Sequence, residues 1–264
     1  PFMDGQATYE AVPWDYCCGK EKVGGDLAYR TGWDARVTGP TGNVIPARSL
    51  PLPASYYCPS DTLPTQGHKL SNYTLSMGNQ TMGAHGGAPN LFPGNDFGGG
   101  SAGEGNGVTP QQTSGIVARY NWAARYRDIT DGTSNVIAAG EIRPACSEHL
   151  NRGPWHHDSV WAATTSPVNF PNVCNGDANA NTVNDSAPGY TAGSCPPTAG
   201  LNDVCWTTRR WNNWQTSNGF KSRHTGGAHF LMCDGTVHFL SSNIDYLTYQ
   251  KLGDRRDGGE VGGF

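Results

Sequence analysis

The segment Phe220–Leu240 near the C-terminus constrains the fold of this chain more than any other. In it, Asp234-Gly235 lies between two runs of alternating apolar and polar residues. An Asp-Gly pair in this setting is the strongest short-range signal for a two-residue β-hairpin turn, because both turn positions need positive φ. The register that follows pairs four sets of residues across the hairpin: Cys233 with Thr236, Met232 with Val237, Leu231 with His238, and Phe230 with Phe239.

This register predicts which side chains of the hairpin reach the core. It places Met232 and Val237 on one face of the hairpin, together with the two phenylalanines. We therefore expect that face to pack on the core and the opposite face, which carries His229 and His238, to meet solvent or an interface.

Composition bounds the class of protein. With 264 residues the chain can form one large domain or two small ones. Its 36 Gly and 18 Pro predict extensive loops, while 36% hydrophobic and only 15% charged residues are not the profile of a disordered protein. The net charge of −4 and the lack of a basic run argue against nucleic-acid binding and against docking to anionic membranes.

Short strands and long loops together predict an α+β fold, mostly antiparallel β, in a single globular domain spanning 1–264. Residues 69–77 alternate as one strand, and Val136–Ala139 is a short buried strand, whereas 116–126 fits either a strand or a helix. The Gly-rich segment 78–115 and the polar segment 163–204 are expected to be loop insertions.

Two further local structures are predicted from turn and cap residues. Asp131-Gly132 indicates a turn before the following strand, for which a structural role is preferred to the alternative of a catalytic one. The segment Asn243–Leu252 fits a short helix capped by Asn243. Its residues Ile244, Leu247 and Leu252 would face the core.

The cysteine content indicates an oxidising compartment. An even number of cysteines, 8, in a loop-rich chain is typical of disulfide-bonded proteins outside the cytoplasm. We expect at least three disulfides, one of which joins Cys174 to Cys195, although several cysteines, Cys233 especially, could instead be buried free thiols. The disulfide candidates are Cys17, Cys18, Cys58, Cys146, Cys174, Cys195 and Cys205.

A candidate calcium site lies in the polar loop. Asp177, Asn179, Asn181 and Asp185 place oxygen side chains at positions 1, 3, 5 and 9, and Val183 offers a carbonyl at position 7. This order resembles that of an EF-hand loop, but the glycine at position 6 and the glutamate at position 12 are missing. The alternative is a turn-rich loop without a ligand, because Asn and Asp tolerate turns.

Histidines supply two other candidate sites. Cys146, His149, His156, His157 and Asp158 could ligate a transition metal and support a metal-dependent hydrolase, but their spacing matches no motif. The alternative is a set of hydrogen-bonded surface histidines in a loop flanked by tryptophans.

The second candidate pairs His224 with Asp234. A carboxylate beside a histidine suggests general-base chemistry. No nucleophile motif accompanies the pair. The preferred interpretation is that His224 hydrogen-bonds backbone near the hairpin and locks its turn.

Tryptophans supply a third kind of candidate. Aromatic rings beside Asn, Asp and Arg can bind a glycan, although the same rings serve cores and protein interfaces. The residues concerned are Trp155, Trp161, Trp206, Trp211 and Trp214.

Four segments of the chain carry a family resemblance. They are CPSD at Cys58–Asp61, SNY at Ser71–Tyr73, RDITDGTSNVIAAGE at Arg127–Glu141, and Phe220–Leu240, in which His224 is followed by nine residues and then Asp234-Gly235. With these segments in this order, the chain resembles the pilin-like proteins of planctomycetes. These proteins have a prepilin-type N-terminal helix and end in the same His, nine residues, Asp-Gly signature.

The resemblance implies a pilin-like or pseudopilin-like protein and no particular activity. This chain begins Pro1-Phe2-Met3-Asp4 and has no apolar run near 18 residues, so we expect no membrane span in it. Either the helix is removed or lost, or the chain is the ordered part of a longer one.

We therefore expect a pilin-like globular domain without that helix and without enzymatic activity. It would be a structural, self-assembling subunit of a cell-surface, periplasmic or extracellular filament. Its partners would be copies of itself, through segments 78–115 and 205–216, and possibly other surface or secretion-system proteins. The alternatives are a surface module that binds calcium or a glycan, and a metal-dependent hydrolase.

Overall fold

The structure is a computed structural model. It describes residues 52–61, 70–83, 91–92, 94, 103, 107, 109–119, 122–147, 149–150, 161–172, 174, 213–259, 261–262 and 264, together with the backbone of four short strands near the N-terminus. These strands form two antiparallel pairs, β1 (Lys22–Val23) with β2 (Asp26–Leu27) and β3 (Arg36–Thr38) with β4 (Val44–Pro46).

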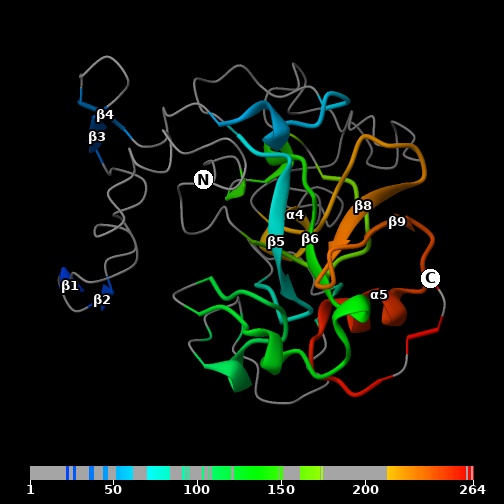
Figure 1. Ribbon diagram of the computed structural model, residues 1–264. Helices are drawn as coiled ribbons and strands as arrows, with labels where there is room; N and C mark the ends of the chain where they lie inside the picture. The colour runs from blue at the N-terminus through cyan, green and yellow to red at the C-terminus, as the bar shows by residue number, and fades with distance from the viewer. Residues whose placement is uncertain are drawn as a thin grey trace.

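The centre of the fold is a mixed sheet of five strands in the order β7-β5-β6-β8-β9. Figure 1 labels β5, β6, β8 and β9 of this sheet. Its strands are β5 (Tyr73–Gly78), β6 (Ile137–Glu141), β7 (Trp161–Ala163), β8 (Gly227–Met232) and β9 (Val237–Ser241). All neighbours are antiparallel except β5 and β7, which are parallel. The prediction of an α+β fold with mostly antiparallel strands is confirmed, as are the strands expected within 69–77 and at Val136–Ala139.

Helices are short. The α-helices are α4 (Trp214–Ser217) and α5 (Tyr246–Gly253), and the 3-10 helices are η2 (Ala54–Tyr56), η4 (Pro110–Gln112), η5 (Tyr126–Asp128), η6 (Thr133–Asn135) and η7 (Pro144–Cys146). Within the described part of the chain, no helix has the length and apolar character needed to cross a bilayer. The described residues of segment 116–125 form a loop closed by a bridge between Val117 and Ala123, and Tyr126 begins η5.

The β8–β9 hairpin exists, but its predicted register is wrong by one residue. Leu231 pairs with Val237 and Phe230 with His238. The reason is the turn: Met232 N–H donates to the Thr236 carbonyl (2.8 Å), and Gly235 N–H donates to the Met232 carbonyl (3.0 Å). The loop therefore has three residues, and Gly235, at φ +90°, occupies its left-handed position.

The shifted register changes which side chains reach the core. Phe230 and Met232 are buried as expected, but Val237 and Phe239 are exposed, by 64% and 47%. Leu240 takes their place in the core from β9. A slip of one residue reverses the face of a strand because side chains alternate.

The core lies on the side of the sheet that carries Phe230 and Leu240. Phe220 and Phe230 meet edge to face with ring centroids 5.1 Å apart, and Tyr249 of α5 packs against the same ring. The buried members of this cluster are Ile137, Ile142, Leu150, Ala162, Val168, Phe220, Ala228, Phe230, Met232, Leu240, Tyr249 and Leu252. A second cluster, Met77, Met82, Trp161 and Ala163, forms around β5 and β7.

Helix α5 begins two residues later than the predicted cap implies. Asp245, not Asn243, is the N-cap, and its carboxylate accepts the Thr248 N–H at 2.8 Å. Leu252 is buried and Ile244 packs against the core as expected, but Leu247 is 47% exposed. Leu247 lies about 200° around the helix from Tyr249, so the buried stripe that carries Tyr249 and Leu252 leaves Leu247 outside.

The Asp131-Gly132 turn, which precedes β6, contacts the C-terminal segment, and the residue after it contacts the β8–β9 turn. Gly132 has φ +88°, and the Asp131 carboxylate accepts the backbone N–H groups of Asp257 and Gly258. Asp234 N–H donates to the Thr133 carbonyl, so the hairpin turn also rests on this segment. The turn predicted at these two residues is present and is held by these hydrogen bonds.

Candidate functional site

All four of the sequence segments quoted above meet at the ends of β5, β6 and β8. Cys58 follows η2, Asn72 immediately precedes β5, and Glu141 is the last residue of β6. A shallow hollow marks the meeting point. It is lined by Cys58, Asp61, Asn72, Glu141, Ile142, Arg143, Lys221, Ser222 and Arg223.

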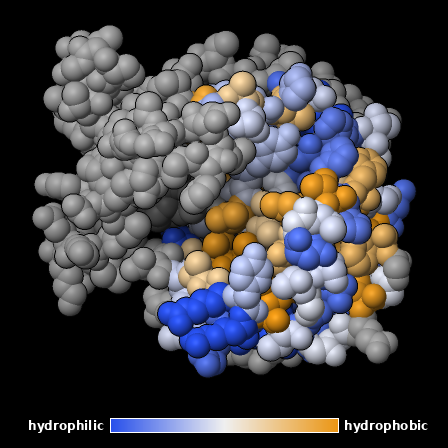
Figure 2. All heavy atoms as spheres, in the orientation of Figure 1, coloured by the Kyte–Doolittle hydropathy of each residue, from blue (hydrophilic) through white to orange (hydrophobic). Residues whose placement is uncertain are grey.

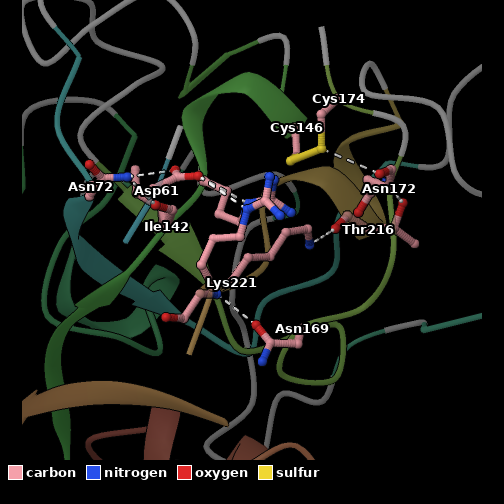
Figure 3. Close-up of a disulfide and its surroundings, with 12 residues drawn as sticks. Asp61, Asn72, Ile142, Cys146, Asn169, Asn172, Cys174, Thr216 and Lys221 are labelled. Atoms are coloured by element: carbon pink, nitrogen blue, oxygen red, sulfur yellow. Dashed lines mark hydrogen bonds and ion pairs between the residues drawn. A yellow bond between two sulfur atoms is a disulfide. The ribbon is translucent and has the colours of Figure 1, made fainter. Parts of the chain in front are cut away.

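Asn72 holds the turn that contains Cys58 against the sheet. Its side-chain carbonyl accepts the Cys58 N–H at 3.0 Å, and its amide donates to Asp61 Oδ2 at 2.8 Å and to the Ile142 carbonyl at 3.2 Å (Figure 3). Only 1% of Asn72 is exposed. One buried amide thus ties the CPSD segment to the end of β6.

Asp61 is a buried carboxylate with two arginine partners. Its Oδ1 lies 3.4 Å from Arg143 Nε and 3.7 Å from Arg223 Nε. The Asp61 side chain is 3% exposed and that of Arg143 is 7% exposed. Since a buried charge needs a partner, this network is a structural requirement of the site.

Beside it, Glu141 contacts two histidines. Glu141 Oε1 lies 3.2 Å from His224 Nε2, and Glu141 Oε2 lies 3.4 Å from His229 Nδ1. Oε2 also accepts the backbone N–H of His229 at 2.8 Å. Cys58 Sγ lies 3.8 Å from the same Nε2 of His224. Glu141 and Cys58 are buried, while the His224 side chain is 33% exposed.

The arrangement differs from a nucleophile–histidine–acid triad. In a triad the acid contacts one ring nitrogen and the nucleophile contacts the other. Here the thiol and the carboxylate approach the same nitrogen of His224. The three donor atoms converge on one point, which is the geometry of a ligand set.

Tyr73 borders the cluster, and its burial and the nearby charges change the pKa of its phenol. Burial raises the pKa of the Tyr73 phenol, and the charges of Cys58 and Glu141 raise it further. Tyr73 and Glu141 are cross-strand partners in β5 and β6, so the ring stands next to the carboxylate on one face of the sheet.

Comparison with known proteins places the chain in a family. The family model described as a protein of unknown function, DUF1559, matches residues 1–247. The chain belongs to the DUF1559 family. No curated protein and no solved structure matches it. The matched region contains the whole Cys58–Glu141–His224 cluster.

In this DUF1559 protein the two residues of the predicted His224–Asp234 pair lie at opposite ends of β8. The residues between them run along the strand, so His224 neither meets Asp234 nor locks the turn. Asp234 is exposed and accepts the N–H and the hydroxyl of Thr236. Both bonds lower the pKa of its carboxyl group. The His224 contacts with Glu141 and Cys58 replace both predicted roles.

One disulfide is present among the described residues, between Cys146 and Cys174 (Figure 3). The predicted Cys174–Cys195 bond is therefore wrong, since η7 brings Cys146 to Cys174 instead. Cys58 is a free buried thiol rather than a disulfide partner, because its turn faces Glu141 and His224. Cys233 is also free and half-buried. Cys17, Cys18, Cys195 and Cys205 lie outside the described residues.

Several other predicted sites lie outside the described residues. They include the whole candidate calcium loop, with Asp177, Asn179, Asn181, Val183 and Asp185, as well as His156, His157, Asp158, Trp155, Trp206 and Trp211.

Three described members of those sets make contacts within the fold. Cys146 is oxidised and cannot ligate a metal, and His149 is buried edge-on against Trp214. Trp161 is 1% exposed and belongs to the second core cluster.

Sequence reasoning singled out His224 but missed its partners. Glu141 had a detectable signal, because it ends a buried strand where a lone carboxylate needs a partner. Cys58 and His229 had none of their own. All of these residues lie in the segments quoted for the family resemblance, but those segments are far apart in the sequence.

Proposed function

We propose that this DUF1559 protein is a structural, self-assembling, pilin-like subunit outside the cytoplasm. It serves a cell-surface or filamentous assembly and acts without catalysis. Its contacts with copies of itself are made through one face of the central sheet. The observation that carries the proposal is a continuous exposed apolar surface on that face.

The surface follows the strand register. Leu75 pairs with Ala139, Ala139 with Leu231, and Leu231 with Val237, so one row of apolar side chains crosses β5, β6, β8 and β9. Leu75 is 41% exposed, Leu231 40% and Val237 64%. Directly paired residues project to the same side of a sheet, which makes the row continuous.

A neighbouring row adds a large hydrophobic side chain at each end, while Glu141 and His229 occupy its middle. Tyr73 pairs with Glu141, and His229 pairs with Phe239. Tyr73 and Phe239 are 39% and 47% exposed. We call the exposed face formed by Tyr73, Leu75, Leu231, Val237 and Phe239 the open sheet face. Hydrophobic residues gather over the region of these strands in the space-filling view (Figure 2).

A second copy of the chain is the occupant that we propose for this face. Contiguous apolar surface usually marks an interface. In the described part of the sheet, β9 is the outermost strand next to β8, and it carries the two most exposed residues of the face. An outer strand beside an apolar face suits contact between identical chains, and a head-to-tail contact that does not close gives a filament.

The other segments predicted for the interface are less suited to it. Buried residues occur in both segments: Ser114 in the Gly-rich segment, and Gln215 and Thr216 directly after Trp214. Gly78 and Gly115 pack backbone to backbone, since a Cβ at Gly115 would lie 2.2 Å from the Met77 carbonyl carbon. Parts of these segments thus belong to the interior of the protein, although Leu91 in the Gly-rich segment is 48% exposed.

Two further observations support an extracytoplasmic, pilin-like role. The Cys146–Cys174 disulfide is typical of oxidising compartments. The resemblance to planctomycete pilin-like proteins rests on segments that pack together around the sheet, rather than on scattered matches.

The test is the state of the purified native chain at micromolar concentration, by light scattering and negative-stain microscopy. We expect oligomers or filaments for the wild type and monomers for Val237→Glu combined with Phe239→Glu, because two buried charges would have no partner in the interface. Tyr126→Glu is the matched control, since Tyr126 is 78% exposed and lies outside the open sheet face. A monomeric wild type would overturn the proposal and favour a module that binds calcium or a glycan.

A further inference from the structure

A thiol, a carboxylate and an imidazole direct their donor atoms toward one point beside the open sheet face. Cys58 Sγ, a carboxylate oxygen of Glu141 and a ring nitrogen of His224 lie within 4.8 Å of one another. We propose that Cys58, Glu141 and His224 bind a zinc ion. This site differs from the calcium loop considered from the sequence, and it does not depend on self-assembly.

The distances fit tetrahedral zinc coordination. With bonds of about 2.3 Å to sulfur and about 2.0–2.1 Å to nitrogen and oxygen, two ligand atoms stand about 3.6 Å apart for sulfur and nitrogen and about 3.3 Å apart for oxygen and nitrogen. The observed separations are 3.8 Å from Cys58 Sγ to His224 Nε2 and 3.2 Å from Glu141 Oε1 to the same nitrogen. The third separation, between Cys58 Sγ and the Glu141 carboxylate oxygen, is no more than 4.8 Å.

Neighbouring groups hold each ligand in place. The His229 N–H occupies Glu141 Oε2, which leaves Oε1 directed at His224. The Asn72 side chain fixes the backbone of Cys58, and the Ser222 hydroxyl accepts the His224 N–H. Such supporting contacts orient ligands before the metal binds, a common feature of zinc sites.

A metal resolves the contacts of His224 better than hydrogen bonding does. The Nε2 atom carries at most one proton, so it can make one strong hydrogen bond, yet both Glu141 and Cys58 approach it. An ion at the common point bonds to all three atoms. Because thiolate, carboxylate and neutral imidazole carry two negative charges, bound Zn²⁺ makes the buried site neutral.

The ligand types select the metal class. Thiolate and imidazole favour zinc over calcium or magnesium, which prefer oxygen ligands. Asp61 is not drawn into the site, because its carboxylate is already paired with Arg143 and Arg223. Three protein ligands leave a fourth position for water on the side of the partly exposed His224.

Titration of the full-length chain with ZnCl₂ against a chromophoric chelator tests the site. We expect one equivalent bound with a Kd of about 1 µM or tighter. Cys58→Ser should weaken binding at least about 100-fold, because even loss of a supporting contact costs about 10–100-fold. Cys233→Ser is the matched control, since Cys233 is the other free thiol among the described residues and should leave binding unchanged.

A second measurement needs no variant and covers the case in which Cys58→Ser fails to fold. Cobalt added to the wild type should give a thiolate-to-metal charge-transfer band in the near ultraviolet, and zinc should displace it. Absence of the band, or zinc affinity unchanged in a folded Cys58→Ser protein, would overturn the site. Repeating the titration on the Val237→Glu, Phe239→Glu protein separates this outcome from failure of the proposed assembly.

Discussion

At the scale of single residues, buried charges near the C-terminus organise the loops around the sheet. Arg255 donates hydrogen bonds to the carbonyls of Gly115, Asp128, Thr113 and Pro110, and its guanidinium stacks on Trp122 at 4.8 Å. One planar side chain therefore ties segment 110–128 to the end of α5. Lysine could not replace it, because it lacks the rigid fork of donors.

Asp254 precedes this arginine, and the pKa of its carboxyl group is raised. Burial raises its pKa from 3.8 to about 7, and the backbone N–H of Arg256 opposes the rise only partly. Its Oδ2 is buried without a hydrogen-bond partner among the described residues. Between about pH 4 and 7 the folded protein holds this proton and the unfolded chain does not, so this group makes stability fall as pH rises across that range.

We predict that Asp254→Asn stabilises the protein more at pH 8 than at pH 5. The amide keeps an acceptor for the Arg256 N–H and removes the cost of a buried charge. Urea unfolding at the two pH values measures the difference. Asp245→Asn is the control, because hydrogen bonds from Thr248 lower the pKa of this exposed cap and its replacement should give no gain at pH 8. Equal effects of Asp254→Asn at both pH values would contradict the prediction.

At the scale of elements, the hairpin turn decides what the β8–β9 pair presents to each side. Gly235 has φ +90°, and a Cβ there would meet nothing within 4 Å. Any cost of a side chain at this position thus comes from the backbone conformation and not from a clash.

We predict that Gly235→Val destabilises the protein by about 1–2 kcal/mol, because a β-branched residue resists the left-handed region. Gly235→Asn should cost clearly less, since asparagine tolerates this region. The comparison requires thermal or urea unfolding of both variants. An equal loss in the two would show that the volume of the side chain, rather than φ, is what matters.

At the scale of the whole molecule, the four cysteines among the described residues fall into two classes, free thiols and a disulfide. Cys58 and Cys233 are free, and Cys146 is bonded to Cys174. Cys58 belongs to the candidate zinc site and Cys233 to the hairpin turn. The disulfide joins η7, which precedes β7 in the sequence, to Cys174, which follows β7. A disulfide that closes a loop of this kind typically adds about 2–4 kcal/mol to the free energy of unfolding.

We predict that alkylation of the unfolded, unreduced protein in chelator labels Cys58 and Cys233 and spares Cys146 and Cys174. Mass spectrometry of the peptides gives the assignment. The four cysteines outside the described residues are expected to be bonded, which would give three disulfides in total. Labelling of six or more cysteines would contradict that expectation.

Local signals in the sequence predicted local structure well. The strands at β5 and β6, the hairpin, the helix after it and the Asp131-Gly132 turn each follow from patterns within a few residues, because propensity and turn chemistry act at that range. The exact register did not follow. The Cys233 N–H bonds to the Val136 carbonyl and the Asp234 N–H to the Thr133 carbonyl, and these contacts with a distant segment accompany a three-residue turn.

The candidate site shows the same division at longer range. By itself the sequence determined the chemistry that was available: a His224 before a strand, a Glu141 at the end of another, and a Cys58 in a turn. Only the tertiary structure decided that these three meet and that Asp234 stays apart, because their proximity depends on the order β5-β6-β8 in the sheet. Strand order is set by packing between segments far apart in the chain, and no local pattern encodes it.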